Sequence, residues 1–241
     1  MEQGRKKDFY RALLFDIDNT LLNFDASEAE VFKKLLIRFG MNPENRLVEE
    51  YHQINRYFWE QLEEGKMGKD EVLTKRFEVF FSRHGKRISG EEAENFYRLL
   101  LGGSAVLIHG AAELCRDLGE KYLLYIVTNG EASTQYLRLK KSGLKPFFDG
   151  VFVSEEAGSP KPQKAFFDYC FKQMGEKKAG RLGIKREEML LIGDSLTSDM
   201  RGGRNAGIDT CWYNPGHLKN DRGIFVTMEV DSYEELRSIL L

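Results

Sequence analysis

Short, continuous apolar runs alternate along this chain with longer stretches of helical periodicity. The apolar runs are Ala12 to Phe15, Leu123 to Val127, Val151 to Val153, Met189 to Ile192 and Ile208 to Trp212. Because none of these runs alternates with polar residues, each is typical of a strand buried on both faces. Joined by amphipathic helices, such strands predict an α/β fold with a doubly wound parallel sheet.

The segment between the first two runs is far longer than an ordinary crossover. Its apolar residues recur at helical intervals, for example at Val31, Leu35 and Phe39. This periodicity predicts an inserted domain of about four helices over residues 23–103. Residues 1–22 and 104–241 then form the α/β core domain.

Composition and charge narrow the class of partner. The 241 residues are 41% hydrophobic, which is enough for a buried core, and 36 basic residues nearly balance 38 acidic ones. A net charge of -2 excludes the concentrated positive field of a nucleic-acid binder and favours a small-molecule partner. Monomer and dimer both stay open.

Cysteine usage and hydropathy indicate the compartment. Three cysteines without a CxxC pair are typical of reduced, buried thiols rather than of a disulfide framework. The sequence has neither the apolar stretch of a signal peptide nor the run of about 20 apolar residues that a membrane span needs. We therefore expect a cytoplasmic protein without a membrane partner.

Four polar clusters follow predicted strands at the point where each strand ends. In chain order they are Asp16-Ile17-Asp18-Asn19-Thr20, Thr128-Asn129-Gly130, Ser159-Pro160-Lys161-Pro162 and Gly193 to Asp199, which includes Asp194. Taken alone, the first could be a solvated strand end, and the second could be an ordinary turn. The carboxyl ends of parallel strands share one edge of the sheet, so we expect the four clusters to converge on one crevice.

A crevice with several carboxylates, one lysine and a hydroxyl and amide pair suits phosphoryl transfer. Carboxylate oxygens are the ligands that a hard divalent ion such as Mg²⁺ prefers. No glycine-rich Walker loop is present in the sequence, which disfavours transfer driven by a nucleoside triphosphate.

These four clusters, in this order, resemble the four motifs of the haloacid dehalogenase (HAD) superfamily, and the resemblance covers essentially the whole chain. The insertion resembles the helical C1 cap of that superfamily, which implies a Rossmann-like core with an α-helical cap domain. The resemblance implies that Asp16 is the catalytic nucleophile, which forms an aspartyl-phosphate. Asp18 would act as general acid and base. Thr128, the backbone of Asn129 and Lys161 would bind the phosphate, and Lys161 would also neutralise charge during catalysis.

The resemblance also implies a Mg²⁺ cofactor. Its ligands would be the carboxylate of Asp16, the main-chain carbonyl of Asp18 and the carboxylate of Asp194. Asp199 would contribute either directly or through another ligand.

The reaction and substrate follow from finer features of the resemblance. Asp18 favours phosphomonoester hydrolysis, because the dehalogenases of the superfamily keep no aspartate at that position. A narrower likeness, to the bacterial pyrimidine and noncanonical 5′-nucleotidases, rests on residues of the insertion and the tail: Ile54-Asn55 through Phe58-Trp59, Gly65-Lys66, Arg76-Phe77 and Thr210 to Asn214. It implies a nucleoside 5′-monophosphate phosphatase. The alternatives are a sugar-phosphate or phosphoglycolate phosphatase and a catalytically silent binding module on the same fold.

Overall fold

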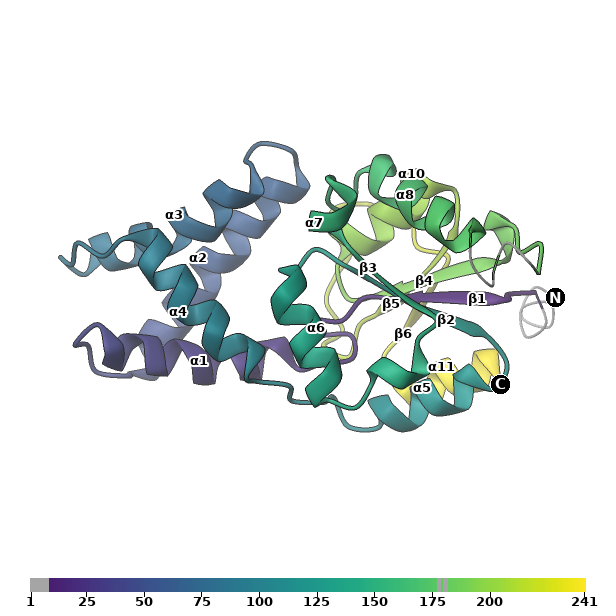
Figure 1. Ribbon diagram of the computed structural model, residues 1–241, viewed down its shortest axis with the longest axis horizontal. Helices are drawn as coiled ribbons and strands as arrows, with labels where there is room; N and C mark the ends of the chain where they lie inside the picture. The colour runs from purple at the N-terminus through teal and green to yellow at the C-terminus, as the bar shows by residue number, and fades with distance from the viewer. Residues whose placement is uncertain (1–8, 177–178, 180–181) are drawn as a thin grey trace. The chain divides into compact units, whose positions relative to one another are not determined.

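The computed structural model describes residues 9–176, 179 and 182–241, and it divides the chain into two compact units (Figure 1). The first unit joins the chain up to Asn23 with Leu107–Ala132 and Ser142–Leu241. The second consists of Phe24–Val106 and Ser133–Lys141. Residues 104–106 and the second segment, 133–141, of this unit lie outside the range 23–103.

Helix α6 (Ala132–Lys141) supplies that second segment. Nε of Arg138 donates a hydrogen bond to the carbonyl of Ser104 at 3.2 Å, and Nζ of Lys141 donates to that of Gly103 at 3.1 Å. A Cβ added to Gly102 would come within 3.2 Å of the Leu137 side chain. These tertiary contacts join α6 to the end of α4 (Gly90–Gly102), and periodicity alone could not predict them.

The first unit contains a six-stranded sheet in the order β3-β2-β1-β4-β5-β6, and every neighbouring pair is parallel. The strands are β1 (Ala12–Phe15), β2 (Leu123–Thr128), β3 (Gly150–Val153), β4 (Met189–Gly193), β5 (Asp209–Tyr213) and β6 (Met228–Val230). The predicted doubly wound α/β fold is confirmed. Strand β6 was not predicted, because its Met-Glu-Val sequence lacks an apolar run and it lies at the edge of the sheet.

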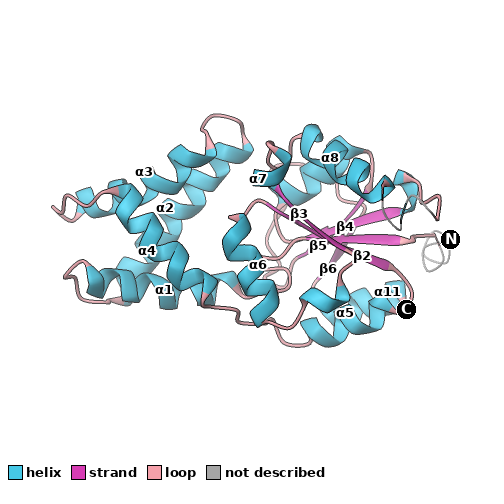
Figure 2. Ribbon diagram, in the orientation of Figure 1, coloured by secondary structure: helices cyan, strands magenta, loops and turns pink. Residues whose placement is uncertain are grey.

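Helices cover both faces of this sheet (Figure 2). They are α5 (Ala111–Gly119), α7 (Ser154–Ala157), α8 (Lys164–Gly175), α10 (Arg201–Ala206) and α11 (Tyr233–Leu240), with short 3₁₀ turns at Lys145–Phe147 and Arg186–Glu188. Ala12 and Leu14 of β1 share one hydrophobic cluster with Phe166 and Phe167 of α8. All four residues of β1 are buried, which explains its continuous apolar sequence.

The second unit contains four consecutive helices, as the periodicity predicted. These are α1 (Phe24–Arg38), α2 (Asn45–Glu63), α3 (Lys69–Arg83) and α4 (Gly90–Gly102). Aromatic side chains fill the space between them: Tyr51 stacks on Phe32 with ring centroids 3.8 Å apart and on Phe77 at 5.2 Å. Most aromatic residues of this unit are therefore core, whereas Tyr57 is 56% exposed.

Among the helices that the structure describes, none combines the length and the apolar character required to cross a bilayer.

Candidate active site

The buried ammonium of the third polar cluster links the first cluster to the fourth. Asp16 directly follows β1, and its amide still donates to the carbonyl of Ile192, which holds it against β4 at 2.9 Å. Lys161 is 1% exposed, and its Nζ donates to Oδ1 of Asp16 at 2.6 Å and to Oδ1 of Asp199 at 2.7 Å. The same ammonium donates to the carbonyl of Val127 at 2.9 Å. All three donor positions of this lysine are used within the site.

Three carboxylates lie together at the carboxyl ends of β1 and β4. Oxygen atoms of Asp16, Asp194 and Asp199 come within 4.8 Å of one another. Gly193, the last residue of β4, makes this packing possible, because a Cβ on it would lie only 2.3 Å from Cγ of Asp199. Any larger residue at that position would displace the Asp199 carboxylate.

Asp199 belongs to a π-helical turn (Leu196–Met200) that follows β4. Its Oδ2 accepts a hydrogen bond from the amide of Ser195 at 3.1 Å, and the hydroxyl of Ser195 accepts from the amide of Ser198 at 3.1 Å. Oδ1 of Asp199 accepts from Lys161 and so orients the lysine, while Oδ2 accepts from Ser195 and stabilises the turn.

The Asn129 side chain holds the main chain of Lys161 from both sides. Its Oδ1 accepts from the amide of Lys161 at 2.8 Å, and its Nδ2 donates to the carbonyl of Lys161 at 3.0 Å. The neighbouring Thr128 hydroxyl is buried and accepts from the amide of Gly130 at 3.1 Å. Hydrogen bonds therefore join the second cluster to the third.

Crowded negative charge sets the electrostatics of the site. Burial raises the pKa of Asp16 to about 7; the carboxylates of Asp199 and Asp18 add to the rise, and Lys161 opposes it. Burial also raises the pKa of Asp194 well above its ordinary range, and repulsion from Asp16 and Asp199 adds to that rise. One ammonium among three clustered carboxylates leaves an excess of negative charge.

This donor set fits a hard divalent cation. The three carboxylates offer oxygen ligands, and their mutual repulsion would fall when a cation binds between them.

Comparison with known proteins identifies the family. The model of the haloacid dehalogenase-like hydrolase family matches residues 10–207, which include all four clusters. The chain belongs to this family. The family resemblance seen in the sequence is thereby confirmed, and the protein is a HAD-like hydrolase.

Relatives of this HAD-like hydrolase match it along nearly its whole length. The HAD-hydrolase YfnB of Bacillus subtilis is 43% identical over 231 residues, which is 96% of this chain and 95% of that protein. The pyrimidine 5′-nucleotidase PynA of Streptococcus pneumoniae is 40% identical over 233 residues, with the same coverage of both chains. A crystal structure of YfnB bound to magnesium has a TM-score of 0.89 at 42% identity, and the match covers 96% of this chain and 98% of that one.

Most of the residues singled out in the sequence of this HAD-like hydrolase lie together. The cluster of three carboxylates contains Asp16, Asp194 and Asp199. Lys161 donates hydrogen bonds to Asp16 and Asp199, and its main chain is hydrogen-bonded to Asn129. The half-buried Asp18 is not part of the three-carboxylate group, although its charge acts on Asp16.

Several contacts at the site were missed. The hydroxyl of Thr20 donates to Oδ1 of Asp194 at 3.4 Å, and the indole of Trp212 donates to the carbonyl of Asp194 at 2.8 Å. The sequence contained a signal for both residues, since Thr20 belongs to the first cluster and Trp212 to a strand. The predicted convergence of the clusters brings Thr20 near Asp194, but the sequence did not indicate these two hydrogen bonds.

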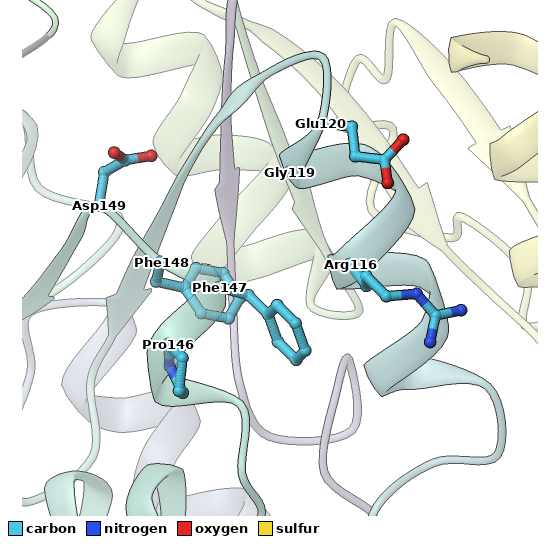
Figure 3. Close-up of a pocket in the computed structure, with 7 residues that line it drawn as sticks. All are labelled: Arg116, Gly119, Glu120, Pro146, Phe147, Phe148 and Asp149. Atoms are coloured by element: carbon cyan, nitrogen blue, oxygen red, sulfur yellow. The ribbon is translucent and has the colours of Figure 1, made fainter.

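A surface hollow elsewhere in the first unit has a different character (Figure 3). It has a volume of about 340 Å³ and is lined by Arg116, Gly119, Glu120 and Pro146 to Asp149. These residues precede β2 and β3, so the hollow lies at the amino ends of the strands, whereas the four clusters follow the carboxyl ends. The carboxyl ends are where ligands bind in open α/β sheets.

Proposed function

We propose that this HAD-like hydrolase is a Mg²⁺-dependent phosphomonoester hydrolase that uses Asp16 as its nucleophile. The observation that carries this proposal is the Lys161 ammonium held between Asp16 and Asp199, beside Asp194. A buried carboxylate next to a fixed cation and further carboxylates suits attack on a phosphoryl group.

The reaction proceeds in two displacements. A carboxylate oxygen of Asp16 attacks phosphorus, the bond to the ester oxygen breaks, and an aspartyl-phosphate forms. Asp18 donates a proton to the leaving oxygen and then accepts a proton from the water that cleaves the aspartyl-phosphate. Thr128 and the main chain of Asn129 bind phosphoryl oxygens. Lys161 exchanges one of its present hydrogen bonds for a phosphoryl oxygen and balances the charge that develops there.

The carboxylates of Asp16, Asp194 and Asp199, with the main-chain carbonyl of Asp18, would hold the Mg²⁺ ion. When bound, the cation supplies positive charge that reduces the repulsion between the nucleophile and the phosphate. The magnesium-bound crystal structure of YfnB, at 42% identity, supports this choice of metal.

The proposed substrate is a nucleoside 5′-monophosphate. The name of PynA, a pyrimidine 5′-nucleotidase at 40% identity over nearly the whole chain, supports this class. We assign substrate selection to a cap domain formed by residues 23–103, and we place the enzyme in the cytoplasm, where its three buried free thiols would stay reduced.

Phosphate release from a panel of phosphomonoesters tests the proposal. With Mg²⁺, the purified protein is expected to prefer nucleoside monophosphates over sugar phosphates and phosphoglycolate. Asp16→Asn should lower release by about 10³-fold or more. Asp168→Asn, which removes an exposed carboxylate paired with Lys164, is the matched control and should keep full activity.

Two outcomes would count against different parts of the proposal. Full turnover by the Asp16→Asn protein would refute the nucleophile. Dominant hydrolysis of sugar phosphates or phosphoglycolate would replace the nucleotidase with the alternative phosphatase, while the chemistry at Asp16 would stand.

A further inference from the structure

Trp212 of β5 makes a hydrogen bond to the residue that follows β4. Its Nε1 donates to the main-chain carbonyl of Asp194 at 2.8 Å. In the parallel ladder Trp212 is paired with Gly193, which is the last residue of β4. The carbonyl of Asp194 therefore lies beyond the strand pairing, and an indole N–H satisfies it in place of a backbone amide.

The indole bond is a stronger anchor of Asp194 than the hydrogen bond from Thr20. The Thr20 hydroxyl reaches Oδ1 of Asp194 at 3.4 Å, near the limit for a hydrogen bond, whereas the indole bond has an ordinary length. The position of the Asp194 main chain thus depends on the side chain of Trp212.

Packing fixes the indole in turn. Trp212 is 2% exposed and shares a hydrophobic cluster with Met200 and Ile224. Met200 is the last residue of the π-helical turn that carries Asp199. The Trp212 side chain therefore contacts two segments that carry carboxylates. It donates a hydrogen bond to the main chain of Asp194, and it packs against Met200, which is next to Asp199.

We propose that Trp212 is a positioning residue for the cation site: its indole N–H and ring hold Asp194 and the Asp199 turn at the spacing that a divalent cation requires. This inference rests on the proposed function, because it assumes that the carboxylates bind Mg²⁺. Groups that orient metal ligands without touching the metal commonly change metal affinity about 10–100-fold when they are removed.

Trp212→Phe removes the N–H and keeps an aromatic ring in the cluster. Isothermal titration of the metal-free protein with Mg²⁺, without substrate, is expected to show a dissociation constant raised about tenfold. In activity assays the Mg²⁺ concentration for half-maximal rate should rise in parallel, and saturating Mg²⁺ should restore most of kcat. A purely structural role would lower the melting temperature without this shift in Mg²⁺ dependence. Trp59→Phe, a change in the helical unit, is the matched control and should leave the dissociation constant unchanged.

The wild-type titration separates the two ideas. Absence of Mg²⁺ binding by the wild-type protein would overturn the proposed function together with the inference. Binding by the wild type with equal affinity in Trp212→Phe would overturn only the role of Trp212.

A second measurement covers the case in which Trp212→Phe does not fold. The chain has two tryptophans, so the Trp59→Phe protein keeps Trp212 as its single indole fluorophore. Its emission is expected to change on Mg²⁺ addition, with the half-saturation found by calorimetry. Unchanged emission at saturating Mg²⁺ would contradict the inference.

Discussion

Lys161 is the residue on which the geometry of the site depends most. Burial lowers the pKa of its ammonium, but attraction from Asp16 and Asp199 outweighs that effect and raises the pKa above its ordinary value. The ammonium stays charged because three oxygen acceptors replace its water. The two carboxylates depend on the same bonds, so each partner makes the burial of the others tolerable.

Lys161→Met tests this dependence. The substitution replaces lysine with a slightly shorter, unbranched apolar side chain and leaves Asp16 and Asp199 buried without their cation, so we expect a loss of about 3 kcal/mol in unfolding free energy. Phosphate release should fall about 10²-fold or more, because charge on the phosphoryl oxygens is no longer balanced. Urea unfolding and a phosphate assay measure the two effects. Lys164→Met, at an exposed lysine three residues away, is the control, and equal behaviour of the two proteins would contradict the prediction.

Helices α1 to α4 each contribute one side chain to a buried network of polar groups. Asn55 of α2 donates to Glu28 of α1 at 2.6 Å and accepts from Arg76 of α3 at 2.6 Å, and Arg76 also pairs with Glu94 of α4. A shift of any of these helices would leave a buried charge or amide without its partner. The polar network therefore favours one register of the four helices.

His52 of α2 extends this polar network and makes the stability of the protein depend on pH. Its Nδ1 lies 2.6 Å from Oε2 of Glu28, and that hydrogen bond raises the pKa of His52 above 6.5, although burial opposes the shift. A raised pKa in the folded state means that the stabilisation is complete below about pH 6.5 and is lost as pH rises through the folded value.

The expected result is a His52→Gln protein whose stability deficit is largest in acid and shrinks as pH increases. Urea unfolding between pH 5 and 9, read against wild type, measures it. His109→Gln removes an exposed imidazole elsewhere in the chain and corrects for the loss of a histidine as such. A deficit that grows with pH would show that the sign is wrong.

Close packing of α3 on α4 depends on Gly90. A Cβ at this position would lie 2.4 Å from the main-chain oxygen of Thr74, which cannot move without bending α3. Gly90→Ala should therefore cost about 1–3 kcal/mol in unfolding free energy. Gly175→Ala, at a helical glycine with no atom within 4 Å of the added Cβ, is the control and should be neutral or slightly stabilising. Thermal unfolding of both variants, compared with wild type, measures the two changes in stability.

Across the whole molecule, the cysteines are buried and unpaired. Cys115 in α5, Cys170 in α8 and Cys211 in β5 are free, and burial raises the pKa of the Cys115 thiol to about 12. Because the thiolate is the reactive form, a thiol reagent such as dithionitrobenzoate should label the native protein negligibly. In denaturant it should label three thiols per chain. Rapid labelling of the native protein would contradict this burial.

The fold was predictable where local pattern and tertiary burial agree. Strands β1, β2 and β4 are buried on both faces, so their sequences are continuously apolar, and α1 to α4 show helical spacing because one face of each packs inward. The pattern failed where burial is partial or the decisive contacts are distant. Strand β6 at the edge of the sheet was missed, and the contacts of α6 with the segment after α4 were not predicted.

By itself, the sequence determined the α/β class, the helical periodicity of the insertion and the family, because these depend on local order and spacing. It also predicted that the four clusters converge, but only the tertiary structure decided which atoms are bonded to one another. The sheet order places β1 between β2 and β4, and that order brings Lys161 to Asp16 from 145 positions away in the chain. The paired bonds from Asn129 and the indole bond from Trp212 to Asp194 arise from the same convergence of strand ends. Contacts between distant residues depend on how strands are ordered and packed, which spacing along the chain does not encode.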